Sequence, residues 1–334
     1  MSLCTSQERV ISSTKHHVKP IHLVIGFVMA TFNATQSRVN GALGHFVGSA
    51  ITAALVSFGS GLVVVTLIVL SVPKFRTAFQ SIPELVRSGE LKWWQCIGGI
   101  SGAFYVIGQG FIVPIIGVAI FTIAIVAGQT VSSLFVDKFG LGPAGPRAVN
   151  AWRVFSAALA IVGVIVSVLG RDHTGTFSLP AIMYAFGSGS LTAAQYAVNG
   201  RVAKSTQQPL ASTLLNFLVG TSTLIVVMIL DVVATHKMIP APPSPFEHPI
   251  LWTGGTIGVV YIAAAAVLVR LLGVLIFALT AVVGQLTGAV ILDIVFPTSG
   301  SHVTTELLLG VGITAGAVIL ASFTPQRNAR KVTQ

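Results

Sequence analysis

Residues 93–136 read WWQCIGGISGAFYVIGQGFIVPIIGVAIFTIAIVAGQTVSSLFV, and no charged residue lies between Lys92 and Asp137. A helix crosses a bilayer with about 20 apolar residues. This stretch is too long for one crossing, and Pro114 with Gly117 in its middle predicts a turn. We therefore interpret it as a hairpin of two transmembrane helices, over 94–113 and 117–136.

The composition of the whole chain agrees with a membrane protein. Of its 334 residues, 53% are hydrophobic and 8% are charged, whereas roughly a quarter are charged in soluble domains. This excludes a water-soluble globular protein. The net charge is +10, but no long segment is polar enough to bind nucleic acid, so we expect no nucleic-acid partner. Cys4 and Cys96 lack the spacing of a metal site or a disulfide framework, so we expect no metal and no cofactor.

Other long gaps between charged residues predict further membrane-spanning helices, ten in all. The predicted spans are 21–42, 48–71, 94–113, 117–136, 151–169, 178–200, 210–232, 249–269, 273–294 and 304–323. The fold class is therefore an all-α integral membrane protein. Residues 1–20 and 324–334 are its polar tails.

The positions of the basic residues predict the orientation, because Lys and Arg near spans are retained on the cytoplasmic side. With the N-terminus inside, sixteen Lys and Arg lie on the cytoplasmic side and three lie opposite, namely Arg38, Arg171 and Lys237. Both termini are therefore predicted to be cytoplasmic. The same bias accounts for the net charge without an anionic partner.

The sequence also contains an internal repeat, with one small insertion or deletion after the second helix. The matching residues are Gln36, Val39, Asn40 and Gly41 with Gln195, Val198, Asn199 and Gly200; Leu55, Phe58 and Gly61 with Leu214, Phe217 and Gly220; Gly98, Gly99, Gly102 and Tyr105 with Gly254, Gly255, Gly258 and Tyr261; Gly117, Val118, Ile120 and Phe121 with Gly273, Val274, Ile276 and Phe277; and Gly128, Gln129 and Asp137 with Gly284, Gln285 and Asp293. The repeats cover 21–170 and 178–323. Each has five helices, and an odd number predicts that the second is inverted, as in carriers that work by alternating access.

The order of these motifs resembles a known family. The pattern is QxxxNG in the first helix, an aromatic residue and Gly in the second, GGxxGxxY in the third, and GVxIF with GQ and a distal Asp in the fourth. It is similar to the small YdcZ-like proteins of the drug/metabolite transporter (DMT) superfamily, here with the unit present twice. The resemblance implies a ten-helix inverted-repeat carrier of small organic solutes, commonly an exporter. We expect a multi-pass protein of the bacterial cytoplasmic (inner) membrane, as a monomer or homodimer, with the bilayer and a small-molecule solute as its partners.

Polar and aromatic residues inside spans are the candidates for a substrate-binding site, because they are costly in a bilayer unless they are paired or line a wet path. Gln129 and Gln285 fall near the middle of equivalent helices. Asn33 and Gln36 share one helix face. The predicted site residues are Gln129, Gln285, Gln36, Gln195, Asn33, Tyr105, Tyr261, Phe121, Phe277 and Asn216. The alternative is that these side chains only hold neighbouring helices together.

Two of the polar candidates break the repeat. Gln109 and Asn216 have no identical counterpart, and Ser57 occupies the position equivalent to Asn216. We expect such departures from symmetry to be places where substrate specificity arises.

Asp137 and Asp293 end their predicted spans, so a structural role is favoured over proton coupling. Each could mark the interface or pair with a base such as Lys138. No Asp or Glu lies at the centre of any predicted span, which argues against antiport through a buried carboxylate. A neutral, zwitterionic or anionic solute is at least as plausible as a cationic one.

The function predicted from these patterns is secondary transport around a central polar and aromatic site. The alternatives are a channel-like or accessory subunit, a translocase for a lipid or lipid precursor, and a membrane enzyme acting on lipid. No HExxH, GxSxG or Walker motif is present, so we expect no enzymatic activity.

Basic and aromatic residues over 75–92 predict either an amphipathic stretch on the inner surface or an ordinary loop.

Overall fold

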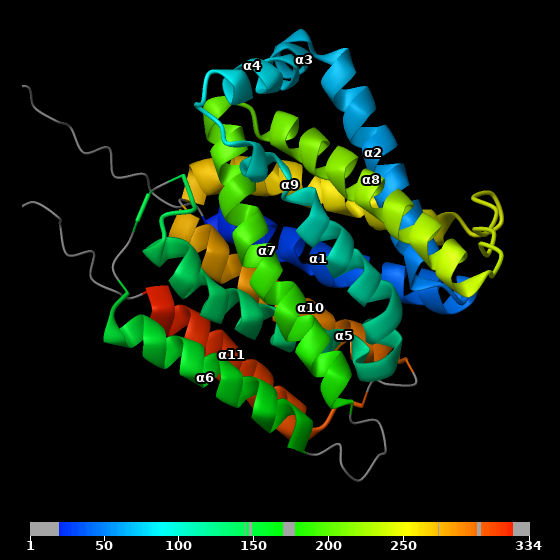
Figure 1. Cartoon of the computed structure of the whole chain (residues 1–334). Helices are drawn as coiled ribbons and strands as arrows, with labels where there is room; N and C mark the ends of the chain where they lie inside the picture. Colours follow the sequence, from blue (N-terminus) through cyan, green and yellow to red (C-terminus); the bar gives the residue numbers. More distant parts are fainter. Residues whose placement is uncertain are drawn as a thin grey trace, which may run out of the picture.

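The structure is a computed structural model that describes residues 20–143, 145–146, 149–169, 178–272, 274–298 and 302–322. Within these ranges, the side chains of 263, 265–267, 269–272, 274–279 and 321–322 are not described. The described residues form helices and no strand (Figure 1). The elements are α1 (Pro20–Val47), α2 (Ala50–Ser71), α3 (Pro73–Gln80), α4 (Ile82–Arg87), η1 (Trp93–Cys96), α5 (Gly99–Lys138), α6 (Ala151–Val168), α7 (Leu179–Ser205), α8 (Pro209–Thr235), η3 (Pro249–Trp252), α9 (Thr253–Leu272), α10 (Val274–Val295) and α11 (Thr305–Ser322).

Several of these helices have the length and composition of membrane spans. In the part of the chain that the structure describes, four are long and apolar enough to cross a bilayer, namely Ala50–Ser71, Trp93–Lys138, Ala151–Val168 and Pro209–Thr235. Shorter apolar helices are Pro249–Ile262, Thr280–Val295 and Thr305–Leu320. The helices α1 and α7, which carry the candidate amides Asn33, Gln36 and Gln195, are not among them. The ten spans and the positions of the termini stay predictions.

The long helix α5 is broken where the sequence predicts a turn. Gly117 has φ 80° and ψ 165°, a backbone conformation that glycine adopts readily, and Pro114 lies one turn earlier. The two parts of α5 run in different directions (Figure 1). The first part begins later than predicted, at Gly99, because 93–96 form the separate turn η1, in which the Gln95 side chain accepts a hydrogen bond from the Lys92 N–H (2.9 Å).

Equivalent helices of the two halves meet each other. The rings of Phe58 on α2 and Phe217 on α8 lie 5.2 Å apart. Each ring also packs over a glycine of the opposite helix: a Cβ on Gly61 would clash with Phe217, and one on Gly220 would clash with Phe58. Both partners of this contact are matched by the internal repeat, so the structure places repeat-related residues in reciprocal contact.

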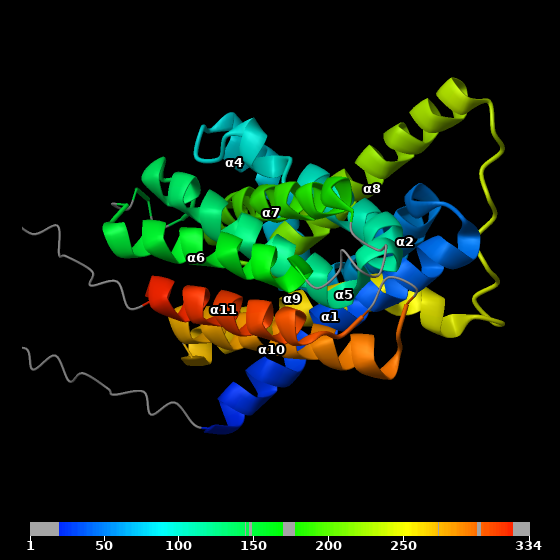
Figure 2. The same cartoon turned by 90° about the horizontal axis from the view of Figure 1, so that it is seen from below.

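The last helices of the two halves also pair. In both views α6 and α11 run side by side along one edge of the bundle (Figures 1 and 2). A Cβ on Gly163 would clash with Thr314, and one on Gly310 would meet the Gly163 carbonyl oxygen. Small residues thus allow close approach of the helix backbones, as is common in membrane proteins.

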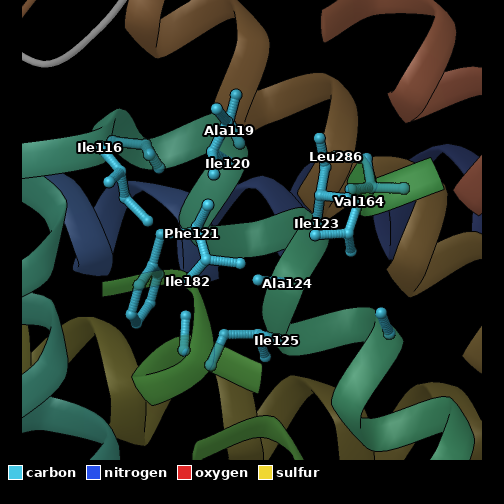
Figure 3. Packing of buried hydrophobic residues seen from close by; sticks show 14 of the residues in the cluster. Ile116, Ala119, Ile120, Phe121, Ile123, Ala124, Ile125, Val164, Ile182 and Leu286 are labelled. Atoms are coloured by element: carbon cyan, nitrogen blue, oxygen red, sulfur yellow. The ribbon is translucent and has the colours of Figure 1, made fainter. Parts of the chain in front are cut away.

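The second part of α5 forms the centre of the largest apolar cluster. Phe121 is fully buried there, among Ile182 of α7, Leu286 of α10 and Val164 of α6 (Figure 3). The crossing of α5 with α7 is tight, since a Cβ on Gly128 would clash with the Phe186 carbonyl and one on Gly189 with the Ile125 carbonyl.

The segment predicted as either an amphipathic stretch or a loop forms two short helices, α3 and α4. Phe79 and Ile82 face inward and join apolar clusters, while Lys74 and Arg87 are exposed. The segment is therefore amphipathic, as one of the two interpretations predicts. Its position on the inner membrane surface stays a prediction.

The α5–α7 crossing gives a stability prediction. We expect Gly189→Ala to destabilise the protein by about 1–3 kcal/mol, because the added methyl group meets the Ile125 backbone, which cannot rotate away. The matched control is Gly187→Ala on the same helix, where nothing lies within 4 Å of the new Cβ. Thermal unfolding of the detergent-solubilised protein measures both. Equal melting temperatures for the two variants would contradict the close crossing.

Candidate functional site

The first part of the candidate site is a hydrogen-bonded chain of polar side chains between α1 and α5. Tyr105 donates its hydroxyl to Asn33 Oδ1 (3.2 Å). Gln109 Nε2 donates to Ser37 Oγ (2.8 Å), and Asn40 Nδ2 donates to Gln109 Oε1 (2.7 Å). Gln109 and Asn40 are fully buried. The amide of Gln109 therefore uses its two ends to join two positions of α1.

The second half has a corresponding cluster with a different centre. Gln195 Nε2 and Asn199 Nδ2 of α7 both donate to Asn216 Oδ1 of α8, at 2.7 and 3.1 Å. In the first half the repeat places Ser57 at the position of Asn216, and the network there is built around Gln109 of α5 instead. In each half the amides of the first helix are therefore hydrogen-bonded, but the partner comes from α5 in the first half and from α8 in the second.

The first helix of each half also reaches the third helix of the other half. Gln36 Nε2 donates to the Gly254 carbonyl oxygen (3.0 Å). A Cβ on Gly258 of α9 would lie 2.7 Å from Gln36 Nε2, and one on Gly102 of α5 would lie 2.8 Å from Gln195 Nε2. These repeat-related glycines leave room for repeat-related glutamines.

Three of the four tyrosines lie on helices that carry these polar contacts. Tyr105 of α5 bonds Asn33, Tyr196 follows Gln195 on α7, and Tyr261 lies one turn after Gly258 on α9. Gln285 Nε2 of α10 lies 3.4 Å from the Tyr261 hydroxyl, to which it donates. Tyr196 is 53% exposed, so part of its side chain is accessible. We define Tyr105, Tyr196, Tyr261 and Gln285 as the tyrosine cluster.

A comparison with protein families identifies the family of this chain. The family model DMT_YdcZ, described as "Putative inner membrane exporter, YdcZ", matches residues 21–166 and again residues 180–320. The chain belongs to the YdcZ-like family. The two matches show the family unit in duplicate, and they identify the chain as a multi-pass protein of the cytoplasmic membrane and a member of a transporter family. No curated protein matches it.

The remaining predicted site residues of this YdcZ-like protein lie in different settings. Phe121 touches the site, because its ring lies 5.8 Å from that of Tyr105, but its side chain is part of the apolar core. Gln129 is partly exposed, and among the described residues no hydrogen bond joins it to the tyrosine cluster. The side chain of Phe277 lies outside the described ones.

Tyr196 is the residue that the sequence did not indicate. Its repeat equivalent is Ser37, so a search for matching pairs passes over it. The only available signals were its place directly after Gln195 and the small number of tyrosines in the chain. Ser37 was missed for the same reason, although it accepts a hydrogen bond from Gln109.

The two aspartates at the span ends have separate partners in this YdcZ-like protein. Asp137 forms an ion pair with Arg153 of α6 (2.5 Å), not with Lys138. Asp293 is only 3% exposed and does not lie at an open interface. Its Oδ1 and Oδ2 accept hydrogen bonds from the backbone N–H groups of Val118 (3.0 Å) and Ala119 (2.7 Å). Both carboxylates thus have structural contacts.

The amide chain of the first half gives a prediction about coupling. We expect Asn40→Ala and Gln109→Ala each to destabilise the protein by about 1 kcal/mol, because each leaves the other amide without its partner. The double variant should then lose less than the sum, with a coupling energy of roughly 0.5–2 kcal/mol. Unfolding measurements on the double-mutant cycle check this.

The control cycle combines Asn40→Ala with Thr77→Ala on the exposed face of α3, whose hydroxyl bonds only within its own helix. That pair should be additive. Strict additivity of Asn40→Ala with Gln109→Ala would show that their hydrogen bond contributes nothing to stability.

Proposed function

We propose that this protein is a secondary transporter that exports a small organic solute by alternating access around a site between its two halves. The observation that carries the proposal is that hydrogen bonds join polar and aromatic residues of α1, α5, α9 and α10: Tyr105 to Asn33, Gln36 to the Gly254 carbonyl, and Gln285 to Tyr261. These helices come from both halves of the chain. A site shared by two halves can change its access when the halves move relative to each other.

The chemistry of the residues supports a binding role for the tyrosine cluster more than for the amide networks. The buried amides of Asn40 and Gln109 are hydrogen-bonded to each other, and the buried Asn216 accepts from Gln195, so a solute would have to displace an existing partner. The side chain of Tyr196, an aromatic ring that carries a hydroxyl group, is partly accessible. Ligand sites commonly join apolar walls to a few polar groups in this way.

The absence of charge from the described part of the tyrosine cluster bears on the solute. Its members are phenols and an amide, and the aspartates of α5 and α10, Asp137 and Asp293, have the structural contacts given above. The site therefore offers hydrogen bonds and ring faces to a neutral or zwitterionic solute. We further propose an inverted arrangement of the repeats 21–170 and 178–323, ten spans, and both termini in the cytoplasm.

The decisive experiment is reconstitution. A library of small organic solutes is first ranked by thermal stabilisation of the purified protein, and the best is then assayed for uptake and counterflow in liposomes. Saturable flux with counterflow is expected from a carrier. Unsaturable conductance would point to a channel, and conversion of the solute to a product would point to an enzyme.

Tyr196→Phe is expected to weaken binding of that solute by roughly 2- to 10-fold, since one hydrogen bond to the ligand is lost. Gln285→Ala should act in the same direction. The matched control is Tyr184→Phe, because the fourth tyrosine donates its hydroxyl to the Phe104 carbonyl (2.8 Å) and stacks on the Phe104 ring outside the cluster. If Tyr184→Phe weakens binding as much as Tyr196→Phe, the tyrosine cluster is not the site.

A further inference from the structure

The two repeat-related aspartates are in different states, although the sequence around them is alike. Asp293, near the end of α10, holds the first two N–H groups after the break at Gly117 in α5. The N–H groups of a first helical turn have no acceptor within their own helix. A carboxylate at this position also interacts favourably with the positive end of the helix dipole. The contact therefore fastens the end of α10 to the start of the second part of α5.

The internal repeat defines what the equivalent contact would be. Val118 corresponds to Val274 at the start of α10, and Asp293 corresponds to Asp137 at the end of α5. A symmetric structure would place the Asp137 carboxylate on the first N–H groups of α10. In this structure Asp137 is instead paired with Arg153, and its side chain is 29% exposed.

One end of the α5–α10 pair is thus fastened by an aspartate, and the aspartate of the other end is held elsewhere. Gln285 of the tyrosine cluster lies on α10, and Tyr105 lies on the first part of α5, which continues through Gly117 into the fastened second part; α5 and α10 pack against each other. A change in how their ends are fastened would therefore move the walls of the site. The electrostatic interaction of Arg38 on α1 with Asp293 brings the first helix to the fastened end as well.

We propose that Asp293 and Asp137 are alternating latches that decide from which side the site is open. The contact of Asp293 with Val118 and Ala119 closes the external side. The contact of Asp137 with the start of α10 closes the cytoplasmic side after Asp137 leaves Arg153. Only one latch forms at a time. No proton transfer is needed, since each aspartate exchanges one set of hydrogen-bond donors for another. This inference rests on the proposed transport function.

The test measures access to the site from each side without any substrate. In a background with Cys4→Ser and Cys96→Ser, the reporter is Tyr196→Cys, at the member of the tyrosine cluster whose side chain is exposed. A membrane-impermeant maleimide is added to sealed vesicles of either orientation, and the labelling rate is read for each side. The parent should label faster from the cytoplasmic side.

Asp293→Asn should raise the external labelling rate by about tenfold, because the charge-assisted hydrogen bonds that close that side are weakened. Asp137→Asn, the matched variant of the repeat, should lower the external rate. Shifts in opposite directions support the latches, because general destabilisation would move both variants the same way. Shifts in one direction, or no shift, overturn the proposal.

Should Asp293→Asn not fold, as judged by its melting temperature and elution profile, Arg153→Gln replaces it. This change frees Asp137 and should raise the external rate, whereas Asp137→Asn lowers it; equal effects overturn the latches. A reporter that is reached from neither side, or from the same single side in every variant, overturns the proposed transport mechanism together with the latches. A reporter reached from both sides but unaffected by either aspartate overturns the latches alone.

Discussion

A polar group inside a lipid bilayer finds no water, so its hydrogen-bond partners have to come from the protein. In this chain that constraint acts on side chains as well as on the backbone. Gln109 is fully buried, and its amide is used at both ends, by Ser37 and Asn40. Gln36 donates a hydrogen bond to the carbonyl oxygen of Gly254 in the other half. These hydrogen bonds hold the helices at defined rotations about their axes.

Close helix contacts make these polar contacts possible. Where Gln36 and Gln195 meet the opposite half, the residues below them are Gly258 and Gly102, and a side chain there would occupy the space of the amide. The same principle brings α5 against α7 and α6 against α11. Some glycines in these helices allow close helix packing, and others leave room for a polar side chain. The sequence alone does not distinguish the two kinds.

The sequence predicted most of the helices and the place of the break in α5, because Pro and Gly act locally and the gaps between charges are long. The family and the duplication were also predictable, since they depend on the order of motifs. The partners of Asp137 and Asp293 were not predictable. Arg153 lies on the next helix after Asp137, and the N–H groups of Val118 and Ala119 lie in the other half of the chain from Asp293, so only the packing of helices brings these groups together. Tyr196 was missed because pairs were sought, and it has Ser37 as its counterpart.

The combination of Tyr196 with Ser37 has a consequence for how such a protein can evolve. Two identical half-length chains that associate must carry the same residue at both equivalent positions, so a tyrosine on one side imposes a tyrosine on the other. Fusion of the two copies removes that restriction. Each copy can then accumulate its own substitutions, and the two sides of the centre of the bundle can carry different residues. The pairing of Asn216 with Ser57 is a second mark of the same freedom. The shared ancestry survives in the glycines, the aromatic rings and paired amides such as Gln36 and Gln195, while single polar positions have diverged.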